Sequence, residues 1–200
     1  MANIKIVESE RNIVQKANKA MAQHLNKVLP RAARKVRGQV ESLFSSALYA
    51  SPEIASLSNG VLRAEFGLTF DPTNQLVRAI VSSLDMSVDK VNNKLQGGFT
   101  IVMQPTDYGN LLSLPIAYQP VDGGALPWLM WLLTLGDSII IGNFGFEVGN
   151  HGRTGRGHMV KTKAPYKVNG AFSGTVDNNF ITRAIARVMP EIKEIILRSI

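Results

Sequence analysis

The chain has 200 residues, which is enough for one domain that buries most of its unfolded surface. It has no cysteine, which excludes a disulfide framework, a thiolate nucleophile and a cysteine-ligated metal site. Its net charge of +7 is unevenly spread, because two basic blocks without acids, residues 11–40 and 148–176, flank a mildly acidic, apolar middle. This segregation predicts a surface that faces a polyanion, or basic and acidic faces that meet between copies; plain solvation of either block stays open.

The segment from about Glu10 to Tyr49 is predicted to be helical, because its apolar residues are spaced three and four apart. Pro30 interrupts this pattern, so we expect either one kinked helix or two in sequence. The apolar stripe fits an ordinary core face, whereas the other face is unusually basic. The first ten residues lack the apolar run of a secretory signal, which favours assembly in the cytoplasm. The basic-face residues that we select as candidate contacts are Arg31, Arg34 and Lys35.

The sequence Ser51-Pro52-Glu53 predicts the start of a helix with Ser51 as the N-cap, and Asn59-Gly60 predicts its end. From Val61 onward the pattern changes to short strand-like runs between turn signals. They predict a meander or a small antiparallel sheet. The runs are Val61–Phe66, Val77–Leu84, Met86–Val91 and Phe99–Met103.

The most apolar run, Ala125–Leu135, is about half as long as the roughly 20 residues that a membrane helix requires. We therefore expect no membrane span, and a short buried or interface helix over Leu126–Leu135. Within it, Trp128 and Trp131 are either core residues or anchors of a subunit interface. Further strands are predicted at Ser138–Ile141 and Phe144–Val148.

The decapeptide Asn150–Met159 reads N-H-G-R-T-G-R-G-H-M. A P-loop needs glycine directly before lysine, but Val160 precedes Lys161, and the glycine spacing does not fit a dinucleotide fingerprint. His151 and His158 lack a third ligand of matching spacing, so we expect no metal, no cofactor and no catalytic residue here.

We interpret the decapeptide as the tip of a long basic hairpin, with glycines that supply adaptable backbone and arginines that supply reach. Arginines on such a hairpin can contact phosphates without reading bases, and contact with an acidic partner subunit predicts the same residues. The candidate contact residues are Arg153, Arg156, Lys161 and Lys163.

The last segment predicts a helix with Asp177 as its N-cap and a kink at Pro190. Ile196 and Ile200 are apolar near the chain end, which indicates a covered surface, and we assign them to a subunit interface. The predicted fold class is α+β, with a small antiparallel sheet packed against a long N-terminal helix and a C-terminal helix. We expect one domain with three stretches, residues 1–50, 51–176 and 177–200.

Three phrases follow one another in the second half of the chain. They are P-W-L-M-W-L-L-T-L-G-D-S-I-I-I (Pro127–Ile141), G-R-T-G-R-G-H-M (Gly152–Met159) and F-S-G-T-V-D-N-N-F-I-T-R-A-I (Phe172–Ile185). This ordered series resembles the neck and tail-completion family of long-tailed bacteriophages. The first half agrees more loosely, through its basic N-terminal helix and the passage S-P-E-I-A-S-L-S-N-G-V-L-R.

The resemblance implies a non-enzymatic structural protein of the virion, which is assembled in the host cytoplasm and forms a ring at the junction of head and tail. The implied ring is a homo-oligomer of six or twelve copies with a tail-completion or tail-terminator role. Its implied partners are a connector or stopper, a tail terminator or tail tube, and the genomic DNA that passes through the lumen. The residues alone also allow a non-sequence-specific nucleic-acid-binding protein, and an enzyme ranks third.

Overall fold

The computed structural model describes residues 8–200, and Met1–Val7, where the expected absence of a secretory signal falls, lie outside the described residues. The fold is mixed, with a long N-terminal helix, small antiparallel sheets and a C-terminal helix, which confirms the predicted α+β class. The chain forms two compact units. The helix–hairpin unit comprises Met1–Val40, Asp85–Val102 and Glu191–Ile200, and the main unit comprises Glu41–Leu84 and Met103–Pro190. These boundaries differ from the three stretches that the sequence predicted.

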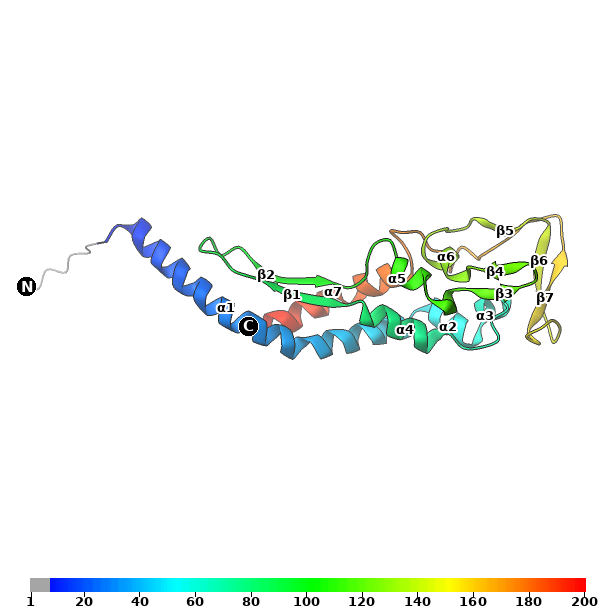
Figure 1. Ribbon diagram of the computed structural model, residues 1–200, viewed down its shortest axis with the longest axis horizontal. Coiled ribbons are helices and arrows are strands. Elements are labelled where there is room, and N and C mark those ends of the chain that lie inside the picture. The colour runs from blue at the N-terminus through cyan, green and yellow to red at the C-terminus, as the bar shows by residue number, and fades with distance from the viewer. Residues whose placement is uncertain (1–7) are drawn as a thin grey trace, which may run out of the picture. The chain divides into compact units, whose positions relative to one another are not determined.

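The helix–hairpin unit pairs the first helix with one hairpin. The helix α1 (Glu10–Tyr49) continues through Pro30, so of the two predicted alternatives the single helix is the one observed. Its residues up to Val40 belong to this unit. The strands β1 (Asp85–Asp89) and β2 (Gly98–Val102) pair antiparallel, and Figure 1 shows them as a long hairpin. A small core joins the two parts: Ala22, Leu25, Leu29, Val88, Val91 and Phe99.

One side chain fixes the hairpin to α1. The amide of Asn26 donates to the Val91 carbonyl at 2.9 Å and accepts from the Val91 N–H at 2.8 Å. Both backbone groups of Val91 are thereby satisfied by a single residue 65 positions earlier. The turn of the hairpin is consequently held against the first half of α1.

The main unit begins with helices where the sequence predicted strands. It contains the end of α1, five further α-helices, a short 3₁₀ helix and the first part of the C-terminal helix, and two of the five helices overturn the strand predictions for Val61–Phe66 and Val77–Leu84. Helical packing wins over the β-propensity of the valines and isoleucine, because the buried positions of the second segment recur every three or four residues. The elements are α2 (Pro52–Asn59), α3 (Val61–Glu65), α4 (Thr73–Ser82), α5 (Gly109–Leu112), η1 (Pro115–Ala117) and α6 (Trp128–Leu133).

Three two-stranded antiparallel sheets complete the main unit, so the β-structure is divided among separate pairs. The predicted strands at Ser138–Ile141 and Phe144–Val148 are confirmed as β5 and β6. The pairs are β3 (Gln119–Val121) with β4 (Gly124–Leu126), β5 (Ile139–Ile141) with β8 (Tyr166–Lys167), and β6 (Phe144–Val148) with β7 (Gly157–Lys161).

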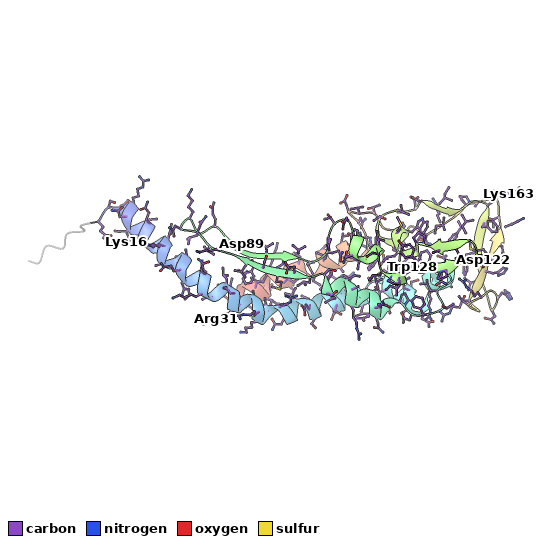
Figure 2. The ribbon with its side chains drawn as sticks, in the orientation of Figure 1. Lys16, Arg31, Asp89, Asp122, Trp128 and Lys163 are labelled. Atoms are coloured by element: carbon purple, nitrogen blue, oxygen red, sulfur yellow. The ribbon has the colours of Figure 1, made fainter. Side chains whose placement is uncertain are left out.

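Trp128 lies in the core of the main unit (Figure 2). Its side chain is 0% exposed, its ring centroid lies 5.8 Å from that of Phe66, and its Nε1 donates to the Ile116 carbonyl at 2.7 Å. The core alternative therefore holds, and the hypothesis of an interface anchor is wrong for this side chain. Trp131 is also buried, at 8% exposure. None of the helices among residues 8–200 combines the length and apolarity needed to cross a membrane.

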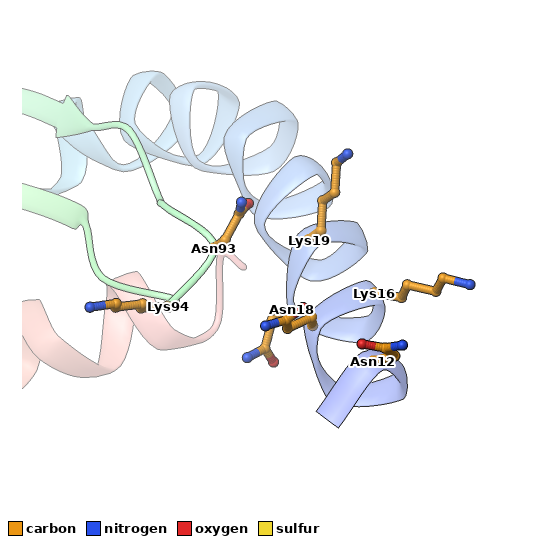
Figure 3. A pocket seen from close by; sticks show the side chains of 7 residues that line it. Asn12, Lys16, Asn18, Lys19, Asn93 and Lys94 are labelled. Carbon is orange, nitrogen blue, oxygen red and sulfur yellow. The ribbon is translucent and has the colours of Figure 1, made fainter. Parts of the chain in front are cut away.

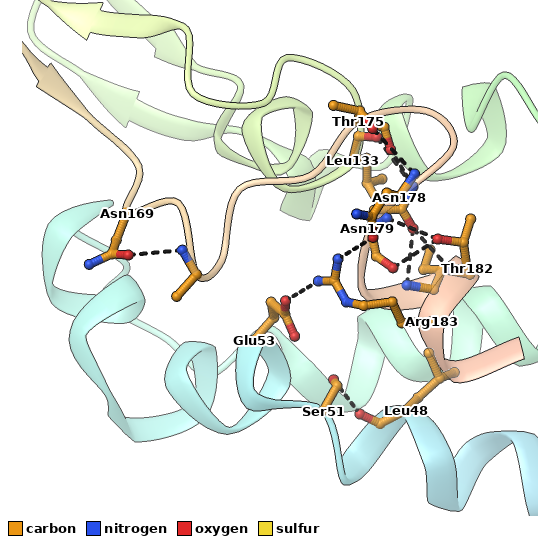
Figure 4. A network of polar contacts seen from close by, with 12 residues as sticks. Leu48, Ser51, Glu53, Leu133, Asn169, Thr175, Asn178, Asn179, Thr182 and Arg183 are labelled. Atoms are coloured by element: carbon orange, nitrogen blue, oxygen red, sulfur yellow. Dashed lines mark hydrogen bonds and ion pairs between the residues drawn. The ribbon is translucent and has the colours of Figure 1, made fainter. Parts of the chain in front are cut away.

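The C-terminal helix α7 (Phe180–Leu197), which contains Pro190, is capped by Asn179 and not by Asp177 as predicted. The Oδ1 atom of Asn179 accepts from the N–H groups of Ile181 and Thr182 at 3.0 and 3.1 Å. Its Nδ2 atom donates to the Tyr108 hydroxyl at 2.8 Å. It also donates to the backbone carbonyls of Leu133 and Thr175, two residues that Figure 4 labels beside Asn179. Because Asn179 is 0% exposed, these bonds replace water at every polar atom of the side chain.

We expect Asn179→Ala to lower the free energy of unfolding by about 2 kcal/mol or more, because it removes the cap and leaves buried partners unpaired. The matched control is Asp177→Ala, which removes the exposed residue that the sequence favoured and should change stability by less than about 0.5 kcal/mol. Urea unfolding of the two variants measures this difference. Equal losses of stability would contradict the assignment of the cap.

Candidate functional site

The decapeptide forms the tip of the β6–β7 hairpin, as predicted. Its glycines, however, serve a fixed and tightly packed turn. Gly152 and Gly157 have φ values of +76° and +150°, which L-residues rarely adopt. A Cβ on Gly157 would lie 2.4 Å from the Glu147 carbonyl, and one on Gly152 would lie 2.1 Å from the Gly157 carbonyl. The expectation that these glycines supply adaptable backbone is therefore corrected: they allow a close approach of backbone to backbone.

Arg153 is bound to its own unit, which corrects the expectation of a freely reaching arginine. Its Nη1 atom donates to the Pro120 carbonyl at 3.1 Å, and its Nη2 atom donates to the Gly67 carbonyl at 3.4 Å. Arg156 is half-buried and lines a cavity of about 370 Å³ with residues of α2 and α3. Arg153 thus ties the hairpin tip to β3 and to Gly67, which follows α3.

The other candidate bases lie on the surface, in two separate groups. Lys161 and Lys163 are exposed at and after the end of β7, where Figure 2 labels Lys163. Arg31, Arg34 and Lys35 are exposed on α1, in the helix–hairpin unit. Figure 2 labels Arg31 on this helix. The structure therefore assigns the two predicted basic groups to different units.

The apolar interface candidates near the chain end keep part of their surface. Ile196 is half-buried on α7, and Ile200 is 53% exposed. Leu197, which the sequence reasoning did not select, is 74% exposed. This exposure is compatible with a subunit interface at the end of the chain, which stays a hypothesis.

A basic groove was missed by the sequence reasoning. It has a volume of about 780 Å³ and lies between the first turns of α1 and the β1–β2 turn (Figure 3). Lys94 could not be selected, because its approach to α1 depends on the bond between Asn26 and Val91. Among the lining residues there is no acid; they are Asn12, Gln15, Lys16, Asn18, Lys19, Asn93 and Lys94.

The charges of this basic groove are spread out. The ammonium of Lys16 pairs with Glu8, and Figure 3 shows the side chains of Lys16, Lys19 and Lys94 pointing in different directions. A single phosphate needs donors that converge on it, whereas a long polyanion is bound by cations distributed along its length. The groove therefore fits an extended polyanion better than a single phosphate group.

No protein-family model, curated protein or solved structure matches this chain. The sites are consequently interpreted from their own geometry. His151 and His158 lie edge to face, with ring centroids 5.4 Å apart. Within residues 8–200, no group of three or more histidine, aspartate or glutamate side chains is arranged to hold a metal ion.

We expect Gly157→Ala to lower the free energy of unfolding by at least about 2 kcal/mol, because the new methyl group would collide with backbone at a left-handed φ. Gly170→Ala is the matched control, since no atom lies within 4 Å of its added Cβ. Thermal unfolding of both variants measures the difference. A flexible tip would instead tolerate both substitutions equally.

Proposed function

We propose that the chain is a non-enzymatic structural protein of a tailed-bacteriophage virion, which forms a homo-oligomeric ring around the DNA channel at the head–tail junction. Its role there is tail completion or tail termination. The observation that supports this proposal is how the three phrases of the resemblance are used: the first and third are hydrogen-bonded to each other, and the second is hydrogen-bonded to other parts of the main unit.

The first and third phrases are joined by backbone hydrogen bonds. The Gly174 N–H donates to the Trp131 carbonyl at 3.0 Å, and the Gly136 N–H donates to the Gly174 carbonyl at 2.9 Å. A Cβ on Gly174 would lie 2.0 Å from the Leu132 carbonyl, so only glycine fits at this position. Asn179 adds a side-chain bond to the Leu133 carbonyl at 3.3 Å. These phrases are therefore accounted for by packing, as expected of a structural protein.

The second phrase is held in the same unit through Arg153 and its two carbonyl acceptors, Pro120 and Gly67. The surface around it has exposed basic and exposed apolar side chains. The bases are Lys161 and Lys163, and the apolar residue is Val148, which is 76% exposed. A closed ring requires two dissimilar surfaces on each copy, because its contacts are heterologous. The main unit offers such surfaces to a neighbouring copy, to a connector or stopper, or to a tail terminator or tube.

The proposal is tested on particles. We expect electron microscopy of purified virions to place this chain in a ring at the neck, and loss of the protein to leave filled heads and tails that do not join. Particles that lack the protein, or normal joining without it, would refute the proposal.

We expect the double variant Lys161→Glu/Lys163→Glu to reduce the yield of joined particles by about tenfold or more, because reversal of exposed charges opposes a complementary partner surface. Lys161→Arg/Lys163→Arg is the matched control and should assemble normally, since it keeps both charges. Infectious titre and particle counts provide the measurement. Equal titres from the two double variants would exclude a role of these charges in assembly.

A non-sequence-specific nucleic-acid-binding protein is the second candidate, and the basic groove favours it. We expect Lys19→Ala/Lys94→Ala to weaken duplex DNA binding and to reduce the slope of log affinity against log salt by about 2, or about 0.9 for each lost phosphate contact. Fluorescence anisotropy over a salt series measures both effects. Arg187→Ala/Lys193→Ala removes two exposed bases of α7 and is the control.

The affinity of the unmodified protein separates the two candidates. Submicromolar binding at physiological salt, with a steep salt dependence, would favour nucleic-acid binding as the main function. A DNA conduit instead requires a lumen that does not retain DNA. Weak binding with a shallow salt dependence would therefore agree with the ring.

A further inference from the structure

A second cavity of the main unit has the composition of a ligand site. Its volume is about 470 Å³, and its walls come from the end of α3, from β3–β4, from β5 and from the β6–β7 hairpin. Much of the lining is apolar, including Phe66, Leu126, Ile140, Phe146 and Met159. Apolar walls with a few converging polar groups are the usual composition of a small-ligand site.

Three polar atoms at this cavity are buried without a hydrogen-bond partner among the described residues. They are Glu65 Oε2, His158 Nδ1 and the hydroxyl oxygen of Tyr166. Tyr166 is only 8% exposed, so solvent at the surface does not satisfy its hydroxyl group. Because buried polar groups in native proteins are almost always hydrogen-bonded, three unpaired ones at one cavity point to an occupant that completes their bonds.

The unpaired groups favour a hydrogen-bond donor that carries positive charge. An ionised Glu65 is an acceptor only, and Nδ1 of His158 is an acceptor when the ring proton is on Nε2. Asp122 adds a second carboxylate to the lining, whereas Arg153 is the one base there and its Nη atoms bind the Pro120 and Gly67 carbonyls. The cavity therefore has more acceptors and negative charge than donors and positive charge.

The electrostatics of Glu65 agree with a positively charged occupant of the cavity. Burial raises the pKa of its carboxyl group, and a hydrogen-bond contact with the Tyr166 hydroxyl opposes that rise. Burial also raises the pKa of Tyr166, and the negative charge of Glu65 raises it further. This contact between the two side chains lies outside regular hydrogen-bond geometry, so Glu65 Oε2 and the Tyr166 hydroxyl oxygen still lack a well-formed hydrogen bond. A cation placed beside Glu65 would favour its charged form.

We propose that this cavity binds an alkylammonium or alkylguanidinium group. Glu65 accepts the charged N–H groups, the Tyr166 hydroxyl and His158 Nδ1 complete the polar end, and the apolar walls hold the aliphatic stem. The cation has two sources with the same chemistry, a free small amine or a lysine or arginine side chain of a second copy. The inference does not rest on the function proposed above, because the cavity and its unpaired groups belong to a single chain.

The test uses the full-length protein and two probes of the same shape. Butylguanidinium carries the charge, and butylurea is its neutral counterpart. We expect titration calorimetry to show saturable binding of butylguanidinium and at least about tenfold weaker binding of butylurea. Glu65→Gln should weaken the binding of the cation by about tenfold or more, because it keeps the shape and removes the charge.

Two further variants separate binding from folding. Tyr166→Phe removes a hydroxyl that lacks a well-formed hydrogen bond, so it should weaken cation binding several-fold without lowering the midpoint of thermal unfolding. Glu191→Gln neutralises an exposed acid that does not line the cavity, and it should leave the affinity unchanged. A loss of stability in Tyr166→Phe with unchanged binding would mean that the hydroxyl has a structural role only and would overturn the proposal.

Analytical ultracentrifugation distinguishes the two sources. If the cation is a side chain of another copy, Glu65→Gln dissociates an oligomer that Glu191→Gln preserves, and free butylguanidinium competes with the contact. If the cation is a free amine, the oligomeric state is the same in both variants and only the affinity differs. Equal binding of butylurea and butylguanidinium, or neither affinity nor oligomeric state changing in Glu65→Gln, would refute the proposal.

Discussion

The main unit depends on the complete hydrogen bonding of one buried side chain, that of Asn179. Its carbonyl oxygen caps α7, and its amide group binds the Tyr108 hydroxyl and the carbonyls of Leu133 and Thr175. Tyr108 in turn donates to the Val176 carbonyl at 3.1 Å. The start of α7 is therefore fixed to the end of α6 and to the segment before α5 by a side chain that is itself fully buried. A cap of this kind is costly to lose, because Tyr108 and Leu133 are buried with it.

Close backbone approach is the second constraint, and it explains where glycine is required. At Gly174 the neighbouring atom is the Leu132 carbonyl, and at Gly157 it is the Glu147 carbonyl. In both places a methyl group would displace backbone, which has little freedom to move in a packed unit. A glycine-rich stretch such as Gly152–Met159 thus has two physical meanings, mobility or proximity. The atoms around each glycine distinguish the two meanings: close backbone indicates proximity at Gly152 and Gly157, whereas open space surrounds the Cβ position of Gly155.

Local patterns predicted the elements that depend on local interactions. The spacing of apolar residues predicted α1 and α7, and the alternating runs predicted β6 and the hairpin that follows it. The wrong predictions occur where residues distant in the sequence determine the secondary structure or the cap. Val77 and Ile80 favour a strand by propensity, but their burial on one face of α4 depends on packing that the segment does not encode alone. Asp177 and Asn179 are both good caps, and the choice between them depends on Tyr108 and Leu133.

The same reasoning applies to the candidate sites. Counting bases selected Arg153 from the sequence, yet its guanidinium is engaged by two carbonyls of its own chain. Counting could not select Glu65, which lies outside the basic blocks, or Tyr166, which carries no charge, and only the fold brings them to one cavity. A charged residue contributes to recognition only when its own chain leaves it unsatisfied. By this criterion two N–H groups of the exposed Arg153 are already used within the fold, whereas Glu65 Oε2 is buried without a well-formed hydrogen bond.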